Sequence, residues 1–521
     1  PRENEGLIMH RDFCGVSRWR TCYTADGTGH TILYTMDNMV VKLGIAVHDR
    51  MEAISLIHDA GRCHGAVVRC LRTGELKTYL AKATVIASGG FGRIYKYSTN
   101  AIINQGTGQS IALDTGLVPL GNMEAVQFHP TGIVPTDILV TEGCRGDGGF
   151  LLDVDEYRFM PDYEPDKQEL ASRDVVSRRM TEHMQKGKGV PSPDGEHLWL
   201  DMRHLGENHL RTKLREVYDI CMYFLGVNPI RELVPVRPTQ HYSMGGIRVN
   251  KDGHAYSLKG LWSVGESACW DLHGMNRLGG NSLAETVVAG MVCGQHMGQW
   301  ASSQILEVDT ALAGNALKEQ QERINTLVAD GMGEANENVD QLLNEAQDIL
   351  QAKVGIFRKG EELEEAVAGL RKIYQRSRNL KMRSAFKGAN PELAAALRLP
   401  GMLKLALCVA KGALLRTESR GGHSREDYPK RNDRDWLKRT LARWPVGADE
   451  PEISYEPVGL LESPPGQRGY GGAENIEMEQ SVAQYNAKVE REWVEQGWQE
   501  TVTPLGAELK EMIEYASTKE S

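Results

Sequence analysis

A short apolar run that ends in paired glycines limits the folds open to this chain more than any other feature. Residues Thr84-Val85-Ile86-Ala87-Ser88 lead directly into Gly89 and Gly90. An apolar strand that runs into a glycine turn is how a nucleotide-binding sheet ends beside its ligand. A buried strand followed by a tight turn has the same composition. The run therefore predicts a strand, and it leaves the nucleotide site as one of two open interpretations.

The regions around this run suggest a divided chain. Three short strand-like runs precede the glycines, at 53–58, 66–71 and 76–81. Residues 140–240 mix loops, turns and helical stretches, and glycine-rich strand-like sequence returns at 241–290. Because a single core stops growing well below 521 residues, we expect roughly two to four domains. The order of these regions predicts a domain inserted into a nucleotide-binding one.

The second half of the chain changes character. Residues 307–420 are mainly helical, and 312–329 and 361–377 show apolar residues three and four apart with polar faces between them. Proline and glycine clusters at 445–475 predict a loop, and the polar residues 476–519 predict a surface helix.

Composition excludes several classes of function. The net charge of −10 argues against nucleic acid as the main partner. Nine dispersed cysteines without a C-x-x-C pair give no reason to expect an iron–sulfur cluster, a zinc site or another metal site in this chain. The most apolar stretch, 399–415, is interrupted by Lys404 and Lys411, so we expect a buried helix there rather than a membrane span.

Four polar clusters could carry chemistry, at 127–131, 141–149, 172–174 and within 241–283. Each has an ordinary alternative: Glu142 and Arg145 could form a simple ion pair, and Ser282 could cap a helix. Taken together, glycines that let the backbone approach a ligand occur beside histidine, arginine and threonine side chains. That mixture is typical of a small anionic substrate that lies against a large cofactor.

These clusters, in this order, resemble the flavoprotein subunits of fumarate reductase and succinate dehydrogenase. The stretches 19–30, 170–176 and 417–429 carry the same resemblance, which extends from about Phe13 to the C-terminal segment. The residues around 122–127 are most similar to menaquinol fumarate reductases that use a dihaem cytochrome b anchor.

The resemblance implies an α/β, Rossmann-like FAD-binding domain with an inserted α+β capping domain, followed by a helical domain and a small C-terminal domain. The expected divisions are 1–131 and 239–306 for the FAD-binding domain, 132–238 for the capping domain, 307–435 for the helical domain and 436–521 for the C-terminal domain. The family begins with a G-x-G-x-x-G turn and a histidine that bonds covalently to the flavin. The 521 residues contain no such turn, so we expect the segment that carries both to lie outside this sequence.

The resemblance also assigns roles at the dicarboxylate site. It implies that the substrate carboxylates are held by His129, Thr141, His241 and Arg277, and that Phe13 and Gln127 line the same pocket. Arginine suits bidentate carboxylate binding, and histidine and threonine add directional donors. Because these residues come from two predicted domains, we expect the capping domain to close over the substrate.

Catalytic and cofactor roles are implied in the same way. Arg173 is the expected proton donor, with Glu142 and Arg145 at the relay positions. The residues expected to contact FAD are Gly89, Gly90, Gly106, Gly108, Glu266, Ser282 and Leu283. Thr107 stands where the family often has aspartate, so an acidic contact with the cofactor is lost there.

The chain is not expected to act alone. Its flavin must exchange electrons with a second redox centre, and the sequence offers none. The resemblance implies an iron–sulfur subunit and a membrane cytochrome b subunit, which would hold the clusters and the haem and attach the chain to the cytoplasmic face of the bacterial inner membrane.

Three alternatives remain open at this point. The complex could work as a succinate dehydrogenase in its physiological direction, since one site catalyses both reactions. A soluble flavoenzyme similar to L-aspartate oxidase would have the same flavin fold and a similar arginine. A scaffold subunit that has lost its flavin would fit the missing glycine turn.

Overall fold

The computed structural model describes residues 8–11, 13, 15, 20–306, 310–329, 337–380 and 382–458. Two small sheets lead to the paired glycines. One is antiparallel, in the order β3 (Met51–His58), β4 (Cys63–Cys70) and β5 (Leu76–Leu80). The other is a parallel pair of β6 (Thr84–Ile86) and β13 (Leu261–Ser263). The strands predicted at 53–58, 66–71 and 76–81 are confirmed, and β6 ends just before the glycines.

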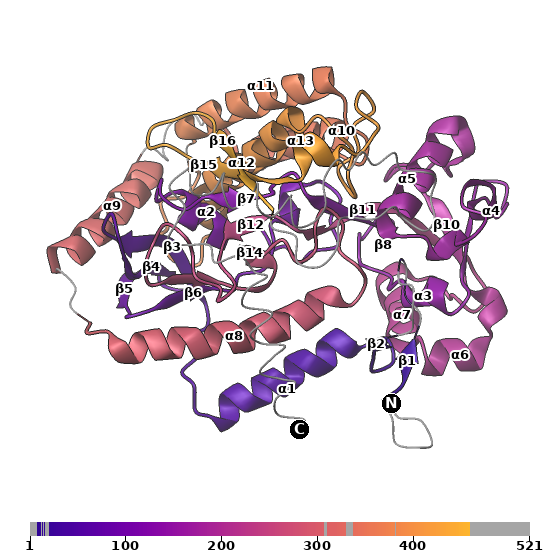
Figure 1. Cartoon of the computed structure of the whole chain (residues 1–521), viewed down its shortest axis with the longest axis horizontal. Helices are drawn as coiled ribbons and strands as arrows, with labels where there is room; N and C mark the ends of the chain where they lie inside the picture. The colour runs from indigo at the N-terminus through magenta and orange to yellow at the C-terminus, as the bar shows by residue number, and fades with distance from the viewer. Residues whose placement is uncertain are drawn as a thin grey trace.

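Residues 132–238, which we call the cap, surround an antiparallel sheet with the order β8-β11-β10-β9. Its strands are β8 (Val126–Ile133), β9 (Phe150–Leu152), β10 (Leu198–Asp201) and β11 (Val234–Ser243). Its helices are α3 (Gly143–Gly146), α4 (Met160–Tyr163), α5 (Arg173–His183), α6 (Glu207–Thr212) and α7 (Arg215–Ile220). Buried residues from Ile133 to Val236 form a core of their own, and the cap lies at the right of Figure 1. This separate core supports the predicted insertion, whose limits stay a prediction.

A five-stranded sheet joins distant parts of the chain in the order β14-β12-β7-β15-β16. Its strands are β7 (Leu120–Gly121), β12 (Gly246–Arg248), β14 (Ala268–Cys269), β15 (Lys438–Arg443) and β16 (Glu452–Pro457). The loop prediction for 445–475 is wrong over β16, which pairs with β15 along its whole length. Residues 459–521, with the helix predicted at 476–519, lie outside the described residues.

A layer of helices covers this sheet at the top of Figure 1. It contains α10 (Val339–Lys353), α11 (Gly360–Arg376), α12 (Pro391–Leu415) and α13 (Asp433–Trp436), while α9 (Thr310–Ala329) packs on β3. Among the described residues, α12 is the one helix long and apolar enough to cross a membrane, and 72% of its apolar window is buried. It is a core helix, as its two lysines predicted. The buried residues of this layer share one core with those of 1–131 and 239–306, the expected FAD-binding domain, which we call the FAD-binding part.

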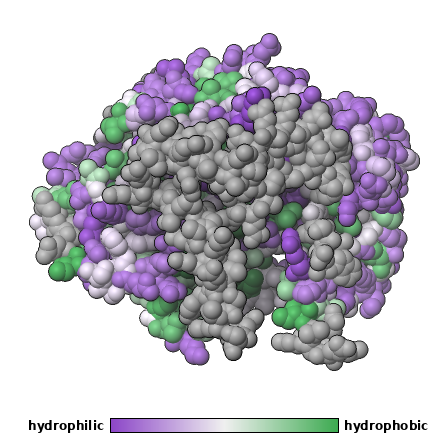
Figure 2. Space-filling model, viewed as in Figure 1, coloured by the Kyte–Doolittle hydropathy of each residue, from purple (hydrophilic) through white to green (hydrophobic). Residues whose placement is uncertain are grey.

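Two helices lie on the lower side of Figure 1, and both expose apolar side chains. They are α1 (Thr28–Lys42), which exposes Leu33 and Val41, and α8 (Asn281–Ser303), which exposes Val288 and Met291. By contrast, the visible surface of the cap is mostly hydrophilic in Figure 2. Large contiguous apolar patches mark surfaces that interact with other molecules. The remaining elements are β1 (His10–Arg11), β2 (Thr21–Cys22) and α2 (Thr107–Leu113).

Candidate active site

Arg173 is the first residue of α5, and its guanidinium is held from two directions. Its Nε donates to Oε2 of Glu142 at 2.6 Å, and one Nη donates to Oε1 of Gln127 at 3.1 Å. All three side chains are buried. A charge-assisted bond between buried partners is strong and directional. Arg173 is therefore fixed at the junction of the cap and the FAD-binding part.

Two histidines from paired strands meet beside Arg173. The rings of His129 on β8 and His241 on β11 lie 4.9 Å apart between centroids. Burial, and next the charge of Arg173, lowers the pKa of both well below the ordinary histidine value, so both are neutral. Nδ1 of His129 accepts from the backbone N–H of Thr131 at 3.2 Å. Its Nε2 therefore carries the proton, and it has no partner within the described part of the chain.

Arg277 completes the group from the other side. Its guanidinium lies 4.4 Å from the ring centroid of Tyr242, and its carbonyl accepts from Nε2 of Gln127 at 2.7 Å. Burial, and next the charge of Arg173, lowers the pKa of Arg277 to about 9. The side chain is still a cation at neutral pH.

The remaining predicted residues surround this centre. Phe13 and Glu142 lie so close to Gly279 that a Cβ there would collide with both. Thr141 accepts from the backbone N–H of Gly143 through its hydroxyl at 3.2 Å. Arg145 donates to the carbonyl of Glu169 at 2.5 Å. Glu142 pairs with Arg173, so the simple ion pair of Glu142 with Arg145 is not what the structure shows.

The electrostatics of this group favour a dianion. Three buried guanidinium groups, those of Arg145, Arg173 and Arg277, outnumber the carboxylates of Glu142 and Glu266 beside them, and Asp174 is already paired with Arg178. Nε of Arg277, and Nε and one Nη of Arg145, are buried donors without a partner among the residues described. Unpartnered buried donors are costly unless a ligand satisfies them. A small molecule with two carboxylates supplies both the acceptors and the charge.

Some residues of this site were not predicted. Asn276 bonds to Gln127 at 2.6 Å and to Asp174 at 2.6 Å, and Tyr242 packs on Arg277. Asp174 and Asn276 stand next to predicted residues in the sequence. Adjacency to an arginine in a polar cluster was the only signal, and it does not reveal a partner 102 positions away.

The expected cofactor residues converge on one edge of a parallel sheet. Gly89 and Gly90 follow β6, and Glu266 follows β13, beside its carboxyl end. Glu266 leaves no room for a Cβ at Gly90, and its Oε1 accepts from the backbone N–H of Ser243 at 2.9 Å. Burial raises the pKa of Glu266 to about 7. Ligands of α/β sheets bind at such an edge.

The first turns of two helices contribute further expected cofactor residues at the same edge of the sheet. Gly106 begins α2 at φ 74°, with Gly108 inside its first turn, and Gly280 begins α8 at φ 79°, so that Ser282 and Leu283 lie in its first turn. A helix N-terminus favours phosphate groups, and the glycines permit close approach of the backbone. The residues present therefore fit a dinucleotide such as FAD.

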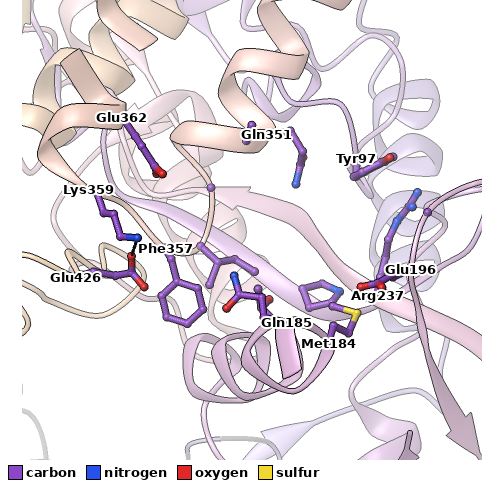
Figure 3. Close-up of a pocket in the computed structure, with 16 residues that line it drawn as sticks. Tyr97, Met184, Gln185, Glu196, Arg237, Gln351, Phe357, Lys359, Glu362 and Glu426 are labelled. Carbon is purple, nitrogen blue, oxygen red and sulfur yellow. Dashed lines mark ion pairs between the residues drawn. The ribbon is translucent and has the colours of Figure 1, made fainter. Parts of the chain in front are cut away.

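A cavity of about 500 Å³ lies elsewhere, between the cap and the helical layer. Figure 3 shows Tyr97, Glu196 and Arg237 on one side of it and Gln351 and Glu362 on the other. Arg237 stacks over the Tyr97 ring at 3.5 Å. None of the predicted site residues lines this cavity among the residues described.

Comparisons with known proteins agree with this geometry. Residues 1–283 match the model of the FAD binding domain, and residues 343–470 match that of the fumarate reductase flavoprotein C-terminus. The chain is 48% identical over 504 residues to the fumarate reductase flavoprotein subunit of Helicobacter pylori, covering 91% of this chain and 70% of that protein. It is 38% identical over 481 residues to the succinate dehydrogenase flavoprotein subunit of Rickettsia conorii, covering 88% and 78%.

Among solved structures, a variant of the quinol fumarate reductase flavoprotein of Escherichia coli is similar, with a TM-score of 0.85 and 34% identity over 91% of this chain and 82% of that one. The expected fold class and the expected FAD cofactor are confirmed by these matches. The chain belongs to the family of fumarate reductase and succinate dehydrogenase flavoprotein subunits.

Proposed function

We propose that this chain is the catalytic subunit of a quinol:fumarate reductase and interconverts fumarate and succinate. One observation carries the proposal: Arg173, fixed by Glu142 and Gln127, lies in a buried group with a cationic excess and unpartnered donors. Such a group binds a dicarboxylate and offers a proton at the same place.

The substrate is held at both ends. We assign its two carboxylates to His129, Thr141, His241 and Arg277, with Phe13 and Gln127 lining the pocket. The neutral Nε2–H of His129 is a directional donor, and Arg277 supplies charge. Donors fixed in advance withdraw electron density from the alkene and stabilise the negative charge that develops during reduction.

FAD supplies the hydride chemistry when it is bound. We assign its contacts to Gly89, Gly90, Gly106, Gly108, Glu266, Ser282 and Leu283. Burial within the group excludes water from the reacting carbons.

Arg173 donates the proton in our assignment. Arginine is a weak acid, with an ordinary pKa above about 12, so it can give up a proton only to a strongly basic carbon. We assign to Glu142, which is bonded to Arg173 at 2.6 Å, the return of a proton to Arg173. We assign Arg145 to the same relay, beyond Glu142.

Electrons must reach the flavin from outside this chain. We propose an iron–sulfur subunit that carries them and a membrane cytochrome b subunit, with haem, that oxidises menaquinol. This places the chain on the cytoplasmic face of a bacterial inner membrane, attached through its partners. An interface above about 1,200 Å² in total is expected between this chain and the iron–sulfur subunit.

The test is to purify the enzyme in mild detergent and to measure fumarate reduction by a quinol and succinate oxidation by a quinone. Both rates, with flavin and iron in the preparation, are expected. Their ratio decides between a fumarate reductase and a succinate dehydrogenase. Activity of this polypeptide alone, with L-aspartate and without iron, would contradict the proposal.

A further inference from the structure

Four side chains at the base of the cap are joined in a ring by three hydrogen bonds and by the peptide link between two of them. Arg173 donates to Gln127 at 3.1 Å, and Gln127 donates to Asn276 at 2.6 Å. Asn276 donates to Oδ1 of Asp174 at 2.6 Å, and Asp174 follows Arg173 in the chain. Arg173 and Asp174 come from the cap, Gln127 from the strand β8 of the cap's sheet, and Asn276 from the FAD-binding part.

The ring fixes which way both amides point. An ionised aspartate only accepts hydrogen bonds, so the nitrogen of Asn276 must face Asp174 and its oxygen must face Gln127. The nitrogen of Gln127 then donates to Asn276 and to the carbonyl of Arg277 at 2.7 Å. Its oxygen is left to accept from Arg173. The charge of Asp174 thus orients the acceptor that holds Arg173.

Asp174 is itself held by a second arginine. Arg178, one turn further along α5, donates to Oδ2 of Asp174 at 2.9 Å and to the carbonyl of Gly421 at 2.9 Å. The neighbouring N–H of Gly422 donates to the carbonyl of Met275 at 2.8 Å, next to Asn276. The start of α5 is therefore fastened to two segments outside the cap.

We propose that Asp174 and Asn276 are positioning residues, which lock the cap against the FAD-binding part and align Arg173 for proton transfer. The inference rests on the proposed function of Arg173. Gln127 lies on β8, where the carbonyl of the next residue, Phe128, accepts from Ser177 of α5 at 3.2 Å. Opening the cap away from Asn276 would therefore break the bonds of Asn276 to Asp174 and to Gln127 together. The cap therefore closes and the proton donor Arg173 is aligned in the same step.

A swap of the two side chains tests the ring. In the Asp174→Asn variant, an NH2 group replaces one of the two oxygens of Asp174. This NH2 group must face one of the two donors, Asn276 or Arg178, and that hydrogen bond is lost. In the Asn276→Asp variant, two carboxylates face each other. In the double variant, the amide introduced at position 174 can donate to the carboxylate at position 276 and accept from Arg178, and that carboxylate can still accept from Gln127. Every bond of the ring can be remade, and only the bond between positions 174 and 276 has its polarity reversed.

We expect each single variant, in the complete enzyme, to lower kcat for fumarate about 10- to 100-fold at unchanged flavin content, the range that small misplacements cause. The double variant should recover to within about threefold of the parent. Single variants with the parent's kcat, or a double variant no better than either single one, would overturn the proposal. Hydrogen exchange at the start of α5 should rise in the single variants and return in the double one.

The two hypotheses can fail separately. If the parent enzyme reduced no fumarate, the proposed function would be wrong. Exchange at the start of α5 would then still decide whether the ring fastens the cap.

Discussion

Arg173 and Glu142 are bonded at 2.6 Å, with both side chains almost completely buried. A buried arginine that has a carboxylate on its Nε can lose a proton and regain it without contact with bulk water. The pair thus combines the poorest acid among the ionisable side chains with a base at bonding distance.

Replacing this arginine should abolish turnover. The Arg173→Lys variant keeps a positive charge but cannot reach both Glu142 and Gln127 in one planar geometry. We expect kcat to fall by about 10³-fold, within the range for a lost general acid, with the flavin spectrum unchanged. Arg179→Lys, a control on the exposed side of α5 that pairs with Glu164, should retain activity. Fumarate reduction near the parent's rate in the first variant would remove Arg173 from its role.

Removing a substrate donor should affect catalysis as well as binding. We expect His241→Ala and Arg277→Ala to raise KM for fumarate and to lower kcat, because their bonds strengthen as negative charge develops on the substrate. Steady-state kinetics over a range of fumarate concentrations separates the two effects. A rise in KM at constant kcat would show that these residues only bind the ground state.

The buried histidines predict a loss of stability in acid. Nδ1 of His423 lies 2.7 Å from a guanidinium nitrogen of Arg358, and its Nε2 lies 3.1 Å from the carbonyl of Arg416. Burial, and next the charge of Arg358, lowers the pKa of His423 well below its ordinary value. Burial, and next the charge of Arg173, lowers the pKa of His129 and of His241 in the same way.

The sign of the pH effect follows from proton binding. Below about pH 6.5 the unfolded chain binds protons at these histidines and the folded chain does not. Stability therefore falls as pH drops below about 6.5, at about 1.4 kcal/mol per pH unit for each histidine that stays neutral. Urea unfolding between about pH 7 and pH 5 measures the slope, and His423→Gln should reduce it. Equal slopes for parent and variant would contradict the assignment.

A buried ionic cluster in the core should be costly to break. Arg416 pairs with Glu124 at 2.8 Å and with Glu418 at 3.0 Å, all within the core. Arg416→Met would take the ion-pair partner from the buried carboxylate of Glu124, while Glu418 would keep its pair with Arg420. We therefore expect a loss of about 3–5 kcal/mol in the free energy of unfolding. The control Arg371→Met removes a surface pair with Glu450 and should cost about 1 kcal/mol or less. Similar losses in the two variants would show that burial does not set the cost.

The sequence predicted those parts of the fold whose signal is local. The run before Gly89 contains β6 (Thr84–Ile86), which ends three residues before the glycines, and the apolar spacing at 361–377 forms α11 (Gly360–Arg376). The strand β16 was missed because its alternating polar residues follow a proline–glycine stretch, and because only its pairing with β15 makes it a strand.

The active site was predictable as a set of residue types but not as a set of contacts. Arg173 and Glu142 were named as acid and relay, and the structure brings them together. The bond of Asn276 to Asp174 was not foreseen, because it spans 102 positions and depends on how the cap meets the rest of the chain. Spacing within a motif carries no information about such a junction.

The cavity between the cap and the helical layer gives a way to detect the proposed movement of the cap through the water that the cavity holds. Its wall includes Glu196 and Arg237 from the cap and Gln351 and Glu362 from the helical layer, so the proposed movement would change its volume. Osmolytes that are excluded from protein surfaces favour states with less exposed surface. An excluded osmolyte such as sucrose should therefore favour the cap position with the smaller cavity, and the change of turnover with sucrose concentration reports how much water the proposed movement displaces.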